Sequence, residues 1–107
     1  MNSAALGSHH KAAVTVLTPV YNGGDFLAEC IDSVLRQSFA DFQYIIVNNR
    51  STDKTLEIAQ QYASKDDRVH VVTNDTFLSM ASNFNRAFSL VPRDAKYVKV
   101  VCADDWI

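Results

Sequence analysis

The sequence predicts an α/β protein with a Rossmann-like open parallel sheet, in the order β-α-β-α-β-α-β. Short apolar segments rich in β-branched residues alternate with longer segments whose apolar residues recur every three or four positions. This unit repeats at a spacing of roughly 30 residues, the length of one strand with its crossover helix. Strands and helices that alternate in this way are typical of a parallel sheet.

The first unit consists of a strand at 14–20 and a helix that starts near Phe26. The strand, VTVLTPV, is apolar and β-branched, and it should end near Pro19 because proline cannot donate a ladder hydrogen bond. Asp25 is the expected N-cap, and Arg36 is expected in the last turn, where the helix dipole favours a cation. One helix face carries the apolar residues Leu27, Cys30, Ile31, Val34 and Leu35.

The same unit occurs twice more, and a fourth strand follows. The later strands are expected at 44–47, 69–72 and 97–101. The second helix should begin after the capping residues at 51–53, and the third should end before Pro92. The second helix has an apolar face made of Leu56, Ala59, Tyr62 and Ala63. The corresponding face of the third comprises Met80, Phe84, Ala87, Phe88 and Val91.

Length and composition indicate one small globular domain. The chain has 107 residues, of which 48% are hydrophobic and 21% charged, and its net charge of −2 provides no basic field for nucleic acid. No apolar run approaches the roughly 18 residues that a membrane span needs. Residues 1–13 lack the apolar stretch of a signal peptide, and we expect a disordered tail there. Cys30 and Cys102 lack CxxC spacing, which favours reduced thiols and a cytoplasmic location.

Three unusual clusters follow predicted strands, at 19–22, 48–50 and 102–105. The carboxyl ends of parallel strands meet at one edge of a sheet, where ligands of open α/β folds bind. In the third cluster, Asp104 and Asp105 would repel each other unless a cation such as Mg²⁺ neutralised them. A polar turn explains this pair equally well. Asparagines at a strand end likewise suit either a turn or a ligand.

Other chemistries have little support. The sequence contains no GxxxxGK[ST] phosphate loop, and NGG at 22–24 is not a GxGxxG motif. His70, the histidine outside the tail, lies within a predicted strand and has no Ser-His-Asp context. Cysteines and histidines do not occur at zinc-ligand spacing. Residues 73–75, which follow the third predicted strand, are a weaker candidate for a ligand-binding cluster at the carboxyl edge of the sheet.

Four motifs in order resemble the family 2 glycosyltransferases. VTVLTPVYNGGDFLAECIDSVLRQSF resembles the family's first strand, Pro-x-Tyr-Asn turn and first helix. YIIVNNRSTDKTLEIAQQYA resembles the second signature, which is usually an Asp-Asp-Gly-Ser-Thr-Asp run. NFNRAF is similar to an Asn-Arg-Gly/Ala segment on the third helix, and VVCADDWI to the metal-binding Asp-x-Asp (DXD) region. The resemblance runs from Val14 to Ile107.

This resemblance implies the N-terminal half of a GT-A fold, with strand order 3-2-1-4. Residues 14–107 would form the part that binds a nucleotide diphosphate sugar, with Mg²⁺ or Mn²⁺, for inverting transfer to an acceptor glycan or other hydroxyl compound. In the family the general base lies in the acceptor half, further along the chain, so we expect this chain alone to be inactive. We also expect a homodimer through the sheet surface that the absence of the acceptor half would leave exposed.

The family's motifs assign roles to particular residues here. The acidic pair of the second signature is replaced by Asn48 and Asn49, whose amides offer both a donor and an acceptor to a base edge. We therefore expect a relaxed base preference. Cys102 stands where many members have an aspartate. The resemblance assigns metal binding to Asp104 and Asp105, and nucleotide-sugar binding to Pro19, Tyr21, Asn22, Asn48, Asn49, Asn85, Arg86 and Asp104.

Two other functions remain open at this point. One is a non-catalytic nucleotide-binding or interaction module. The other is a receiver-like signalling domain, which also places acidic residues at strand ends. A receiver would need an acidic cluster after the first strand, and both Asn22 and the missing fifth strand argue against it.

Overall fold

The computed structural model describes residues 14–37, 42–93 and 95–101, and its elements alternate as predicted. The expected disordered tail lies outside these ranges. The strands are β1 (Val14–Val20), β2 (Phe42–Asn48), β3 (Val69–Thr73) and β4 (Tyr97–Val100). The helices are α2 (Gly24–Leu35), α3 (Thr55–Lys65) and α4 (Met80–Ser89). Among the described helices, none has the length and apolar character required to cross a membrane.

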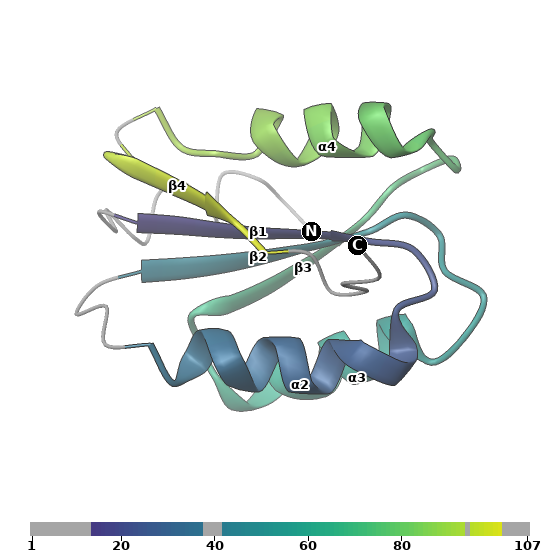
Figure 1. Cartoon of the computed structure of the whole chain (residues 1–107), viewed down its shortest axis with the longest axis horizontal. Coiled ribbons are helices and arrows are strands. Elements are labelled where there is room, and N and C mark those ends of the chain that lie inside the picture. Colours follow the sequence, from purple (N-terminus) through teal and green to yellow (C-terminus); the bar gives the residue numbers. More distant parts are fainter. Residues whose placement is uncertain (1–13, 38–41, 94, 102–107) are drawn as a thin grey trace.

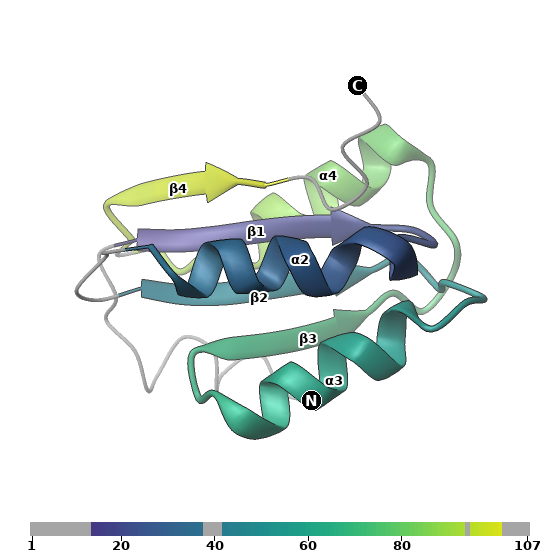
Figure 2. The same ribbon diagram turned by 60° about the horizontal axis from the view of Figure 1, so that its bottom comes forward.

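The described strands form a four-stranded parallel sheet in the order β3-β2-β1-β4, which is the expected order (Figure 2). β1 and β2 are at its centre and are buried over most of their length. In the register, Val16 of β1 lies between Tyr44 of β2 and Lys99 of β4.

Pro19 lies inside β1, a central strand, where a proline is unusual. The Leu17 carbonyl accepts from Val101 on the β4 side, while the Val20 carbonyl accepts from Asn49 on the β2 side. Since backbone groups alternate sides along a strand, the position of Pro19 faces the β4 side. The described β1–β4 register ends at Leu17, so the proline interrupts no ladder bond in it.

The helices form unequal layers on the two faces of the sheet. α2 and α3 cover one face, and α4 covers the other (Figure 1). The α2 and α3 side is the larger core, in which Leu27 and Ile31 of α2 pack against Val16, Val20 and other strand residues. The α4 side is smaller and is built on Leu17, Ile45, Val47, Val72 and Ala87.

Two predictions about the ends of α2 were wrong. Asp25 is in the first turn of α2 and does not cap it, because Gly23 is the N-cap residue and makes no side-chain cap bond. Arg36 is the C-cap residue rather than part of the last turn. The apolar face predicted for α4 is displaced in part: Ala87 is buried and Val91 packs against the same core, but Met80 is 60% exposed and Asn83 is buried instead. The reason for this displacement is a polar contact at the edge of the sheet.

Candidate functional site

The carboxyl ends of the parallel strands and the amino ends of the helices meet along one edge of the molecule (Figure 1). We call the loops there, residues 21–23, 49–54 and 74–79, the rim. The partial positive charge of helix amino ends favours anionic groups at such an edge.

Asn22 joins the first two rim loops. Its side-chain oxygen accepts from the Thr52 backbone N–H at 2.7 Å, and its Nδ2 donates to Thr52 Oγ1 at 3.2 Å. Its own backbone N–H donates to Ser51 Oγ at 2.9 Å. Asn22 has a φ of 51°, a left-handed conformation that asparagine tolerates better than most residues.

Asn48 closes the end of β2. It is buried, and its Oδ1 accepts from the Ser51 backbone N–H at 3.1 Å while its Nδ2 donates to Thr73 Oγ1 at 3.4 Å. The amide therefore holds the turn after β2 and reaches the neighbouring strand β3. Arg50 within this turn has a φ of 55°, a conformation that favours glycine, which is the residue usual at this place of the family signature.

Asn49 joins the second rim loop to the third. It is buried, and its Nδ2 donates to the Leu78 carbonyl at 2.7 Å while its Oδ1 accepts from the Leu78 N–H at 2.9 Å. The same oxygen also accepts from Asn74 Nδ2 at 3.0 Å. Both ends of the Asn49 amide are thus engaged within the protein.

Two further asparagines belong to the site: Asn83 is outside the predicted site residues, and Asn74 lies within the weaker candidate segment 73–75. Both are buried, and Asn74 Nδ2 donates to Asn83 Oδ1 at 2.8 Å. This bond connects the end of β3 to α4 and explains why Asn83, rather than Phe84 or Phe88, shares the inward face with Ala87. The sequence signal for Asn83 is its spacing of four residues from Ala87, which places the two side chains on one helix face.

An aromatic pair stands on the rim. Tyr21 was predicted as a site residue, whereas Phe77 was not. The two rings are 5.0 Å apart between centroids and meet edge to face, with 69° between their planes. Tyr21 remains 44% exposed and Phe77 59% exposed. The sequence signal for Phe77 is a large apolar residue within the polar segment TNDTFLS.

The other predicted residues are placed differently. Pro19 is buried in β1, one residue before the strand ends. Asn85 and Arg86 are on the exposed side of α4, and Arg86 is in its last turn, remote from the rim. Asp104 and Asp105 lie outside the described residues, as does Cys102. In the described part of the chain, no three His, Cys, Asp or Glu residues are grouped to hold a metal ion.

Asp53 fastens the starts of two helices at the rim. Its Oδ2 accepts from the Gly24 backbone N–H of α2 at 3.0 Å, and its Oδ1 accepts from the Thr55 N–H of α3 at 2.9 Å. Burial alone would raise the pKa of Asp53, but the hydrogen bonds from Thr55 and Gly24 outweigh it and hold that pKa below its usual value.

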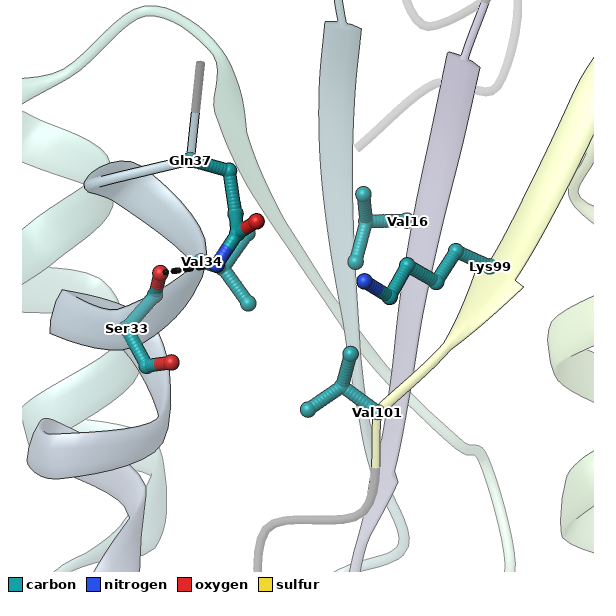
Figure 3. Close-up of a pocket in the computed structure, with 6 residues that line it drawn as sticks. All are labelled: Val16, Ser33, Val34, Gln37, Lys99 and Val101. Atoms are coloured by element: carbon teal, nitrogen blue, oxygen red, sulfur yellow. Dashed lines mark hydrogen bonds between the residues drawn. The ribbon is translucent and has the colours of Figure 1, made fainter. Parts of the chain in front are cut away.

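A separate pocket of about 230 Å³ lies between α2 and the β1–β4 pair (Figure 3). The Lys99 side chain extends from β4 toward it, and Gln37 closes it on the α2 side by donating to the Ser33 carbonyl at 3.2 Å. The last turn of α2 forms one wall, so the pocket is away from the rim. Its lining residues are Val16, Ser33, Val34, Gln37, Lys99 and Val101.

The chain belongs to glycosyl transferase family 2, whose family model matches residues 15–107. This membership agrees with the order of the strands and with the four motifs along the chain. It also removes the receiver-like alternative.

Relatives agree with this assignment. The putative teichuronic acid biosynthesis glycosyltransferase TuaG of Bacillus subtilis is 39% identical over 95 residues, which cover 89% of this chain and 37% of TuaG. The structure of S. aureus TarS 1–349 in complex with UDP has a TM-score of 0.74 and 26% identity, and the match covers 85% of this chain and 27% of that one.

The mannosyltransferase PcManGT of Pyrobaculum calidifontis, solved with GDP-Man and Mn²⁺, shares the fold at a TM-score of 0.74 and 21% identity, over 90% of this chain and 28% of that one. The present chain spans between 13% and 37% of the length of the curated relatives it matches.

Proposed function

We propose that the rim is the donor site of a glycosyltransferase and binds a nucleotide diphosphate sugar. The observation that carries this proposal is the joining of the three rim loops by Asn22 and Asn49 at the carboxyl edge of a family 2 sheet. Related folds whose structures contain UDP or GDP-Man support it.

In this proposal the described residues shape and orient the pocket. Tyr21 presents an exposed ring to the ligand, and Pro19 lies in β1 two residues before it. Asn22, Asn48 and Asn49 set the positions of the loops. Asn85 and Arg86, which the family motif also assigns to the site, lie on the exposed side of α4 and take no part in this proposal.

The diphosphate would lie at the helix amino ends of the rim, toward which β4 runs parallel to β1. Val101, which follows β4, donates its N–H to the Leu17 carbonyl at 2.9 Å, so the chain leaves β4 alongside β1. Asp104 and Asp105 follow, and in our proposal they hold Mg²⁺ or Mn²⁺. A divalent cation bound there would stabilise the negative charge of the departing diphosphate.

Transfer with inversion needs a general base to deprotonate the acceptor hydroxyl. In the family that base lies beyond the stretch matched here, and the relatives are much longer than this chain. We therefore expect donor binding without acceptor-dependent release of nucleoside diphosphate. Such release by this chain alone would contradict the expectation.

Calorimetry with UDP and GDP, with and without Mn²⁺, tests the donor site. We expect the metal to strengthen binding roughly tenfold, which corresponds to about 1.4 kcal/mol, and Asp105→Ala to abolish the gain. Asp67→Ala, at an exposed carboxylate in the turn after α3, is the matched control and should retain it. Equal affinity with and without metal would refute the metal's role, and absence of any nucleotide binding would refute the donor site.

A further inference from the structure

We propose that Phe77 is a second aromatic contact for the donor nucleobase and forms, with Tyr21, an aromatic corner that holds the base by stacking. This inference rests on the proposed donor site. It assigns a role to a residue that none of the sequence motifs includes.

The two rings are arranged to accept a planar partner. Tyr21 and Phe77 touch edge to face and yet stay 44% and 59% exposed. An edge-to-face pair leaves a flat ring face uncovered, whereas rings that merely filled a core would be covered on both sides. Nucleobases stack on such exposed faces of aromatic side chains.

Both rings are carried by loops that are already fixed. Phe77 directly precedes Leu78, whose backbone N–H and carbonyl are both bound by the Asn49 amide. Tyr21 directly precedes Asn22, which is bonded to Thr52 in the next loop. A ligand that enters this corner therefore has little loop-ordering entropy to overcome.

The polar groups nearby favour stacking over recognition of the base edge. Asn48 and Asn49 are buried, and each uses both its Nδ2 and its Oδ1 in bonds within the protein. Stacking tolerates any base, because every base has a π-face. The corner consequently favours nucleoside diphosphates over diphosphates that lack a base, but it discriminates weakly among bases.

The test compares ligands with and without a base. We expect Phe77→Ala to weaken UDP and GDP binding about tenfold, within the range measured for loss of one base–aromatic stack, and to leave inorganic pyrophosphate binding unchanged. Phe77→Trp should restore nucleotide affinity, since the indole also offers a flat face. Phe88→Ala, at an exposed ring on α4, is the control and should change neither ligand.

Each contrary result has a distinct meaning. Equal weakening of UDP and pyrophosphate by Phe77→Ala would assign Phe77 to loop placement and overturn the inference. Unchanged UDP binding by that variant, while the unmodified chain binds UDP, would overturn the inference and leave the donor site standing. If the unmodified chain binds no nucleoside diphosphate, the donor site itself is refuted, and the aromatic corner with it.

Discussion

At the scale of single residues, the rim depends on the two-sided chemistry of the asparagine amide. One amide can donate to a backbone carbonyl and accept from a backbone N–H at the same time. Asn49 does this with Leu78, and a carboxylate at the same position could not donate. The replacement of the family's acidic pair by asparagines therefore changes how the loops are held as well as what a ligand would meet.

We predict that Asn49→Ala lowers the free energy of unfolding by about 2–3 kcal/mol, because it removes one of the two partners of the buried Asn74 amide and the side-chain partner of both Leu78 backbone groups. Urea denaturation measures the change. Asn85→Ala, on the exposed side of α4, should change stability by less than about 0.5 kcal/mol and serves as the control. Equal stability of both variants would mean that the Asn49 amide does not hold the third rim loop.

The same variant tests the predicted relaxed base preference. Chemical-shift titrations with uridine, thymidine and guanosine diphosphates should give similar affinities for the unmodified chain. A strong preference for one base that persists in Asn49→Ala would show that the Asn49 amide does not select the base.

At the scale of elements, the helices at the rim share their capping. α2 and α3 have Gly23 and Lys54 as N-cap residues, and neither makes a side-chain cap bond. Asp53 serves both helices instead, through its two carboxylate oxygens. The close approach also restricts position 24, where a Cβ would lie 2.9 Å from Asp53 Oδ2. A side chain at position 24 would thus displace the Asp53 carboxylate from its capping position.

We predict that Asp53→Asn lowers the free energy of unfolding at pH 7 by about 1 kcal/mol, because an amide nitrogen cannot accept from Gly24. The folded-state pKa of Asp53 is lowered, so its contribution is present above the unfolded-state value near 4 and is lost as pH falls through the folded-state pKa. The difference between the two proteins should therefore shrink in strong acid.

Urea denaturation at pH 7 and near pH 2 measures this convergence. Asp25→Asn, at an exposed carboxylate in the first turn of α2, is the matched control and should follow the unmodified protein more closely at pH 7. A difference between Asp53→Asn and the unmodified protein that stays constant with pH would show that the Asp53 carboxylate does not carry the effect.

At the scale of the whole molecule, the two faces and two edges of the sheet are covered unequally. α4 alone packs on the second face, and β4 pairs with β1 on one side only among the described strands. Tyr97 is 68% exposed and Val98 is 42% exposed on this edge strand. The pocket between α2 and β4 opens beside the same strand. Exposed apolar residues on an unpaired edge favour self-association.

We predict that the chain dimerises or aggregates in a concentration-dependent manner, and that Val98→Lys shifts it toward monomer because a lysine on an edge strand opposes pairing. Sedimentation velocity over a wide concentration range measures this. Phe88→Lys, at a similarly exposed apolar residue on α4, is the control for added charge. A stable monomer at high concentration would refute the prediction.

Local sequence patterns were sufficient to determine the alternation of strands and helices. The bounds of β1 agree with those predicted, and the other strands differ by a residue or a few at their ends. Period-two and helical repeats depend on neighbouring residues, so they can be read without knowing the fold. The strand order came from the family resemblance, which four ordered motifs supported.

The tertiary structure decided what the periodic pattern leaves undefined. A helical repeat shows which residues share a face but not which face packs inward, and in α4 the bond from Asn74 to Asn83 settled that choice. Asp53 caps α2 from 29 residues away, and Phe77 meets Tyr21 only because the loops that follow the strands of a parallel sheet converge at one edge. Such contacts join segments that are distant in sequence, so they depend on the assembled sheet rather than on any local preference.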